Sequence, residues 1–130
     1  MNDKQTITNV RDNPGGYGLN QTYYATAMFL TGVDLGRSGG LLRGFTEWLV
    51  VRRGECSSFY WHKQVLLDLF PDERLVGDWR EPDHLTPAQN REAVDHLCSL
   101  VLAFLEVRDS SQKLSLMYKR FAAMHAHIWD

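Results

Sequence analysis

The chain has 130 residues, of which 44% are hydrophobic and 23% are charged, as expected for one globular domain and not for a disordered chain. Its net charge is −2, and residues 55–109 contain eleven acidic and only five basic side chains. This local acidic excess argues against nucleic-acid binding, because phosphates need a basic surface, and favours attraction of a basic partner.

Neither export nor membrane insertion is expected. The N-terminus is polar and leads into no apolar run, so we expect no secretory signal. No segment reaches the roughly 18 apolar residues that a membrane span requires. The two cysteines, Cys56 and Cys98, form no C-x-x-C pair, and lone thiols of this kind are typical of a reducing compartment. We therefore expect a cytoplasmic protein without membrane contact.

The first part of the chain predicts an irregular segment followed by two helices. Residues 1–19 contain the dense turn-forming run Asn13-Pro14-Gly15-Gly16-Tyr17-Gly18, so we expect an irregular lead-in there. A helix is predicted over 21–30 and should end at Gly32. After a glycine-rich connector, apolar residues spaced by three and four predict a second helix over 41–53.

The rest of the chain predicts three further helices. The third starts at a cap on Ser57 or Ser58 and ends at Phe70, before a proline. Thr86-Pro87-Ala88-Gln89 combines an N-cap, a first-turn proline and a capping box, and starts a fourth helix that ends near Val107. The fifth helix spans 112–126, and its buried stripe should contain Leu114, Met117, Tyr118, Phe121 and Met124 or His125. The predicted fold is an all-α, single-domain bundle of about five helices over residues 1–130.

The long connection at residues 71–85 is the most distinctive predicted surface feature. Its acids can steer a basic protein partner, and its tryptophan can anchor one, although a solvated loop without a partner is the alternative. We expect an ordered acidic loop, because Leu75, Val76 and Trp79 can pin it to the core. The predicted partner-binding residues are Asp72, Glu73, Asp78, Trp79, Glu81 and Asp83.

No catalytic or metal-binding motif is recognisable in the sequence. His125 and His127 are two positions apart and point to different sides of a helix, and the other histidines lack ligand partners at standard spacing. The glycine clusters match neither a P-loop nor a dinucleotide fingerprint. Cys56 precedes the third helix without a paired histidine motif. We therefore assign no catalytic residue, no metal and no cofactor.

One stretch of the chain resembles a known group of proteins. Three successive pieces of the sequence resemble the pattern of a group of small, largely uncharacterised bacterial proteins. They are Val10-Arg11-Asp12-Asn13-Pro14-Gly15-Gly16-Tyr17-Gly18, Leu42-x-x-Phe45-x-x-Trp48-Leu49 and Trp61. The similarity covers roughly residues 7–70, with Asn13 where the group tends to have arginine. The resemblance implies an accessory role, such as immunity to a toxin, and implies no catalytic residues. From the residues themselves, we expect Phe45, Trp48, Leu49 and Trp61 to meet where two helices cross.

Three functions follow as hypotheses. The first is a non-catalytic protein-binding protein, of the immunity type, that blocks a partner toxin by stoichiometric contact. The second is a small enzyme or small-molecule binder, which needs an enclosed pocket between helices with converging polar groups. Its candidate residues are Arg11, Tyr17, Arg43, Glu47 and His62. The third is a DNA-binding regulator, for which Arg43, Arg52 and Arg53 provide few basic residues.

Overall fold

The computed structural model describes residues 2–81 and 84–126, which form seven α-helices, one short 3-10 helix and no strand. The α-helices are α1 (Asp3–Asp12), α2 (Tyr23–Gly36), α3 (Phe45–Arg53), α4 (Trp61–Leu69), α5 (Glu73–Gly77), α6 (Pro87–Arg108) and α7 (Ser111–His125). The predicted all-α class is confirmed, with more helices than the five expected. No helix within these described ranges has the length and apolar character needed to cross a membrane.

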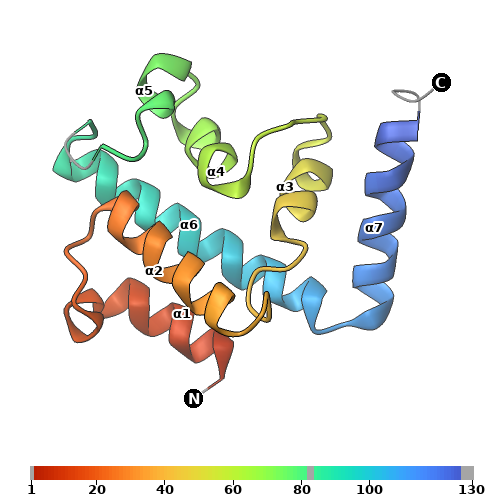
Figure 1. Ribbon diagram of the computed structural model, residues 1–130, viewed down its shortest axis with the longest axis horizontal. Coiled ribbons are helices and arrows are strands. Elements are labelled where there is room, and N and C mark those ends of the chain that lie inside the picture. The colour runs from red at the N-terminus through yellow and green to blue at the C-terminus, as the bar shows by residue number, and fades with distance from the viewer. Residues whose placement is uncertain (1, 82–83, 127–130) are drawn as a thin grey trace.

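The central element of the bundle is α6, which crosses the middle of Figure 1 and contacts α1, α2, α3, α4 and α7. The predicted capping box starts it, because Thr86 Oγ1 accepts a hydrogen bond from the Gln89 amide (3.1 Å) and Gln89 Oε1 accepts one from the Thr86 amide (2.9 Å). Helices cover α6 on several sides, so its buried residues are not confined to one stripe. They are Asn90, Ala93, Val94, Leu97, Cys98, Leu100, Val101, Phe104 and Leu105.

The N-terminal segment is mainly helical, so the predicted irregular lead-in over residues 1–19 is wrong for most of its length. α1 begins at a capping box in which Asn2 Oδ1 accepts from the Gln5 amide (2.8 Å) and Gln5 Oε1 accepts from the Asn2 amide (2.9 Å). Ile7 and Val10 are buried, and α1 packs on α6. The predicted turn-forming run starting at Asn13 does end α1, and residues 14–17 within it form the 3-10 helix.

The two helices around the glycine-rich connector form close to the predicted ranges but have different ends. α2 continues through Gly32, because one glycine weakens a helix without breaking it. α3 starts only at Phe45, four residues later than predicted. Leu41 and Leu42 are instead buried in the preceding loop, and their backbone amides donate to Asp34 Oδ1 at 3.2 and 2.6 Å.

An aromatic cluster lies where α3, α4 and α6 meet. The Phe45 ring lies 5.7 Å from Trp61, 6.0 Å from Trp48 and 5.4 Å from Phe104, measured between ring centroids. Leu49 is fully buried in the same core. The predicted meeting of these aromatic residues is therefore confirmed, and Phe104 of α6 joins them.

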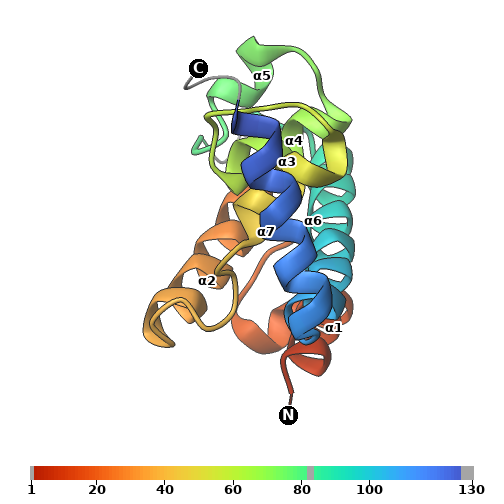
Figure 2. The same cartoon turned by 90° about the vertical axis from the view of Figure 1, so that its right-hand side faces the viewer.

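The last helix, α7, packs beside α3 at one side of the bundle, as Figures 1 and 2 show. It also contacts α6, and Met117 is the buried residue of the helix. Tyr118 is 39% exposed, so its predicted burial is wrong. The difference follows from the packing, because α3 and α6 are the described helices that pack on α7, and most residues of α7 are exposed.

Candidate functional site

The connection between α4 and α6 is ordered and includes the short helix α5. Asp72 caps this helix by accepting a hydrogen bond from the Arg74 amide at 3.0 Å. Val76 is buried, and Leu75 and Trp79 pack against the core. The prediction that Leu75, Val76 and Trp79 pin the connection is confirmed, while its expected loop conformation is corrected by the turn of helix at 73–77.

Trp79 lies against the body of the protein with its ring half-buried. Its ring centroid is 4.7 Å from that of His62 in a stacked arrangement, 6.4 Å from Tyr23 and 6.2 Å from Tyr24. The Arg80 guanidinium lies 5.3 Å from the Trp79 ring centroid, within the range of a cation–π contact. Trp79 therefore fixes the connection in place, and only part of its surface is available to a partner.

The predicted carboxylates of the connection fall into two groups. Glu73, Asp78 and Glu81 are exposed, and their carboxylates make no hydrogen bond or ion pair within the described part of the chain. Asp72 is partly committed, because it caps α5 and also lies 3.6 Å from Arg74 Nε. Asp83 lies outside the described residues. Three carboxylates on an ordered segment thus have unused acceptor capacity.

A small open pocket of about 220 Å³ lies beside Trp79. Its walls include Phe59, Tyr60, His62, Lys63, Trp79 and Arg80. Tyr60 is 76% exposed, although it is an aromatic residue directly before α4. The apolar spacing of the sequence is compatible with burial of either Tyr60 or Trp61, and the structure buries Trp61. Tyr60 is therefore an accessible aromatic residue that sequence reasoning does not assign to the partner-binding surface.

His62 serves as a packing residue between two indole rings. Its ring lies 3.7 Å from Trp61 and 4.7 Å from Trp79, centroid to centroid. Thr31 Oγ1 donates its one proton to the Ala27 carbonyl (2.8 Å) and lies 3.0 Å from His62 Nε2. Because the hydroxyl proton is already used, His62 Nε2 carries a proton and donates it to the hydroxyl oxygen. Burial, and secondarily the charge of Arg80, lower the pKa of His62 from 6.5 to about 4. His62 is consequently neutral at pH 7.

The five residues proposed for a small-molecule site do not meet in one pocket, although Arg43 and Glu47 both lie near enough to Tyr118 to influence its pKa. Arg11 pairs with the neighbouring Asp12, and Tyr17 packs edge-on against Phe29 at 5.5 Å between ring centroids. His62 borders the pocket beside Trp79, whereas Arg43 borders another pocket next to α7. The proposed set is Arg11, Tyr17, Arg43, Glu47 and His62. Each of these two pockets is lined by one member of the set and by no second one.

The two thiols occupy different environments. Cys98 is buried in α6, and burial raises the pKa of its thiol to about 12, which keeps it protonated and unreactive. Cys56 is exposed, and its Sγ donates to the Met124 carbonyl at 3.4 Å. Within residues 2–81 and 84–126, no group of three or more His, Cys, Asp or Glu side chains is placed to hold a metal ion.

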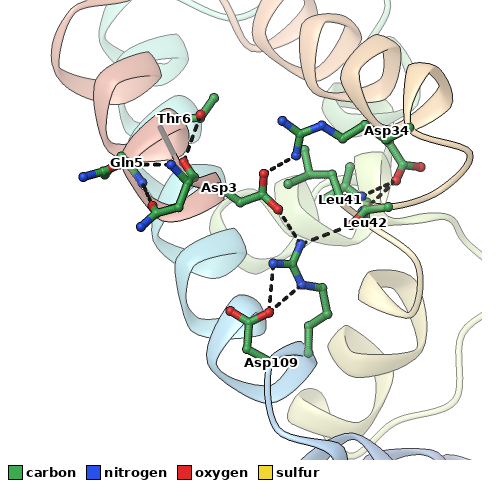
Figure 3. Close-up of polar contacts among 11 residues, drawn as sticks. Asp3, Gln5, Thr6, Asp34, Leu41, Leu42 and Asp109 are labelled. Carbon is green, nitrogen blue, oxygen red and sulfur yellow. Dashed lines mark hydrogen bonds and ion pairs between the residues drawn. The ribbon is translucent and has the colours of Figure 1, made fainter.

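An arginine-rich cluster ties α1 to the loop after α2 and to the end of α6. Asp3 lies between two guanidinium groups, with Arg37 Nη1 donating to Oδ1 and Arg108 Nη1 donating to Oδ2 at 2.8 Å (Figure 3). Although burial opposes the charge, the two arginines lower the pKa of Asp3 below its ordinary value. Arg108 also pairs with Asp109 at 2.9 Å. This cluster lies far from the acidic connection, at the opposite end of the molecule in Figures 1 and 2.

Comparison with known proteins finds no family model, no curated protein and no solved structure that matches the chain.

Proposed function

We propose that the protein is a non-catalytic binding protein that blocks a protein partner by stoichiometric contact, as an immunity protein blocks a toxin. The bacterial group that the sequence resembles points in the same direction. The binding surface is the acidic connection together with Tyr60, and we call it the acidic–aromatic surface. It consists of Tyr60, Asp72, Glu73, Asp78, Trp79 and Glu81, with Asp83 next to it in the sequence.

The observation that carries this proposal is the set of three uncommitted carboxylates, those of Glu73, Asp78 and Glu81, on a segment that the core holds in place. A partner that pairs with these groups has no internal ion pair to break among the described residues. The segment is already ordered by Val76 and Trp79, so little conformational entropy is lost when a partner binds. Both features favour a basic protein surface as the ligand.

Tyr60 supplies the second component that a protein interface needs. Charged rims mainly set the association rate and the choice of partner, whereas buried aromatic side chains supply most of the binding energy. Tyr60 is 76% exposed and borders an open pocket that Trp79 also lines. A partner side chain can fill this pocket and cover the tyrosine ring at the same time.

The acidic–aromatic surface supports a small-molecule site less well than it supports a protein interface. That function needs polar groups that converge on one enclosed pocket. The pocket beside Trp79 is open to solvent, and its histidine is neutral at pH 7 and already bonded to Thr31. Its volume of about 220 Å³ also falls below the usual size of small-molecule sites, which is on the order of 300–1,000 Å³.

The test first asks whether a gene next to this protein's own gene encodes a domain that is toxic when expressed alone, and the absence of such a domain counts against the proposal. The full chain and the domain are co-expressed, and growth and 1:1 complex formation are measured. The triple variant Glu73→Gln, Asp78→Asn and Glu81→Gln should lose protection. The control variant Glu55→Gln, Glu92→Gln and Asp95→Asn makes the same change in charge at exposed acids elsewhere and should retain protection. Equal protection by both variants, or no complex with the wild-type chain, contradicts the proposal.

A further inference from the structure

We propose that the pocket between the α2–α3 loop and α7 binds a small organic anion through a carboxylate or phosphate group. The pocket is open to solvent, like the one beside Trp79, but its volume of about 490 Å³ is larger and lies within the usual range of small-molecule sites. It is lined by Arg37, Arg43, Arg108, Leu114 and Tyr118 and by the loop residues 38–40. Three arginines, and no acidic residue of the described part of the chain, therefore line it. This site is separate from the acidic–aromatic surface and goes beyond the proposed function.

The guanidinium groups differ in how many of their donors are already used. Arg108 is the most engaged, since all three of its guanidinium nitrogens are in contact with Asp3, Asp109 or the Gly40 carbonyl. Among the described residues, the acceptor of Arg37 is Asp3, bonded through Nη1, and that of Arg43 is the Ser38 carbonyl, bonded through Nη2 at 2.9 Å. The remaining N–H groups of Arg37 and Arg43 have no acceptor among the described residues. Two arginines that line this pocket thus have unused donors.

Tyr118 adds a neutral donor to the same pocket. Its hydroxyl has no hydrogen-bond partner in the described part of the chain. Burial and the carboxylate of Glu47 raise its pKa, and the opposing charge of Arg43 does not cancel this effect. The phenol therefore stays protonated at pH 7 and can donate to an anion. Its ring and Leu114 give the pocket an apolar wall for the body of an organic ligand.

The loop that presents the two arginines is held rigidly. Asp34 Oδ1 accepts from the amides of Leu41 and Leu42 and fixes the end of the loop (Figure 3). Ser38 and Gly39 have φ angles of 55° and 82°, a conformation that is costly for serine and that persists only when the surroundings enforce it. Arg37 is held by Asp3 at the other side. Anion binding here requires little rearrangement of the protein.

The charges around the pocket define which ligands it can hold. Asp3 and Asp109 neutralise much of the positive charge of the arginine cluster, and Glu47 lies near Tyr118. Long-range attraction is therefore modest, and recognition must depend on directed hydrogen bonds. Guanidinium groups match the oxygen spacing of carboxylates and phosphates, which makes these the fitting anionic groups. The apolar wall favours a ligand that carries such a group on an apolar body.

The experiment measures binding of phenyl phosphate, benzoate and inorganic phosphate to the full chain, using calorimetry and the backbone amide NMR signals of Gly39 and Gly40. Benzamide serves as the neutral probe. We expect at least one aromatic anion to bind and to shift these signals, with no effect of benzamide. Tighter binding of phenyl phosphate identifies a phosphate site, and tighter binding of benzoate identifies a carboxylate site.

Variants assign the binding to this pocket. Arg43→Gln should weaken the preferred anion about tenfold or more, the loss expected for a charge-assisted hydrogen bond, and Tyr118→Phe should weaken it to a smaller extent. Arg74→Gln removes the same charge at a site with a 94% exposed side chain at the other end of the molecule and should not alter binding. Absence of binding to all three anions, or equal weakening by Arg74→Gln and Arg43→Gln, overturns the proposal. Either result leaves the toxin-protection test unaffected.

Discussion

The hydroxyl of Tyr118 lies directly over Gly44: a Cβ atom at residue 44 would stand 2.7 Å from Tyr118 Oη and 3.6 Å from the Met117 Cε atom. Gly44 also has a φ angle of 92°, which side chains rarely tolerate. The contact joins the start of α3 to α7, and α7 has Met117 as its buried residue. Gly44 therefore permits the close approach of the two helices.

Gly44→Ala should destabilise the protein by about 1–3 kcal/mol, because the new methyl group combines backbone strain with a steric overlap. The free energy of unfolding is measured by urea denaturation. Gly32→Ala is the matched control, since Gly32 lies inside α2 and a methyl group added there would meet nothing within 4 Å. That variant should be neutral or more stable by up to about 1 kcal/mol. A Gly44→Ala protein as stable as Gly32→Ala would contradict both the backbone strain and the steric overlap at residue 44.

The buried, neutral state of His62 predicts that stability depends on pH. Its pKa falls from 6.5 in the unfolded chain to about 4 in the folded protein, so the unfolded chain binds more protons between these values. The stability contributed by neutral His62 is fully present above pH 6.5 and is lost as the pH falls towards 4. Urea denaturation at a series of pH values should show this decrease.

A direct measurement separates His62 from the other titrating groups. In an NMR titration, the ring protons of His62 should shift near pH 4. The variant His62→Gln should lose part of the pH dependence of stability between pH 6.5 and 4. A His62 signal that titrates near pH 6.5 contradicts the burial between Trp61 and Trp79. The stabilisation that comes from Asp3 is lost at lower pH, because the pKa of Asp3 lies below 3.8.

Trp79 is expected to matter mainly for order in the connection. Trp79→Ala removes the ring contacts with His62, Tyr23 and Tyr24 and should cost about 2–4 kcal/mol of stability. Limited proteolysis should then cut the chain within residues 72–81 faster than in the wild type. Trp79→Phe should restore most of the protection, because a smaller ring can still stack on His62. Unchanged proteolysis of Trp79→Ala would show that Leu75 and Val76 are sufficient to hold the segment.

Sequence patterns predict the fold best where one local signal and a long apolar pattern agree. The capping box formed by Thr86 and Gln89 precedes a long helix with many apolar residues, and the structure contains both the capping box and the helix as predicted. Asn2 and Gln5 form the same kind of box, but only Ile7 and Val10 follow as buried residues, and the turn formers beyond them favour an irregular segment. The weaker apolar pattern explains why α1 is not predicted from the sequence.

Local patterns cannot show which charged groups are already used. Asp68 belongs to the acid-rich residues 55–109, yet its carboxylate pairs with Arg52 and Arg53 of α3. It also lies 2.9 Å from His96 Nε2 of α6. Asp3 likewise pairs with Arg108, more than one hundred residues away. Only the tertiary fold distinguishes these paired carboxylates from the unpaired ones of the acidic–aromatic surface. In the same way, only the tertiary fold decides that Trp61 is buried and Tyr60 is exposed.

Tyr60 and Trp79 offer a way to separate partner binding from folding, because they border one pocket but differ in exposure. Tyr60→Ala should change the free energy of unfolding by no more than about 0.5 kcal/mol, since its side chain makes little contact with the core. If Tyr60 anchors the partner, the same variant should lose about 2 kcal/mol of binding free energy, roughly a 30-fold weaker Kd. The control Leu35→Ala removes an apolar side chain that is 74% exposed at the end of α2 and should change neither quantity. Calorimetric titration of the partner measures the Kd, and equal affinities of Tyr60→Ala and Leu35→Ala would remove Tyr60 from the binding surface.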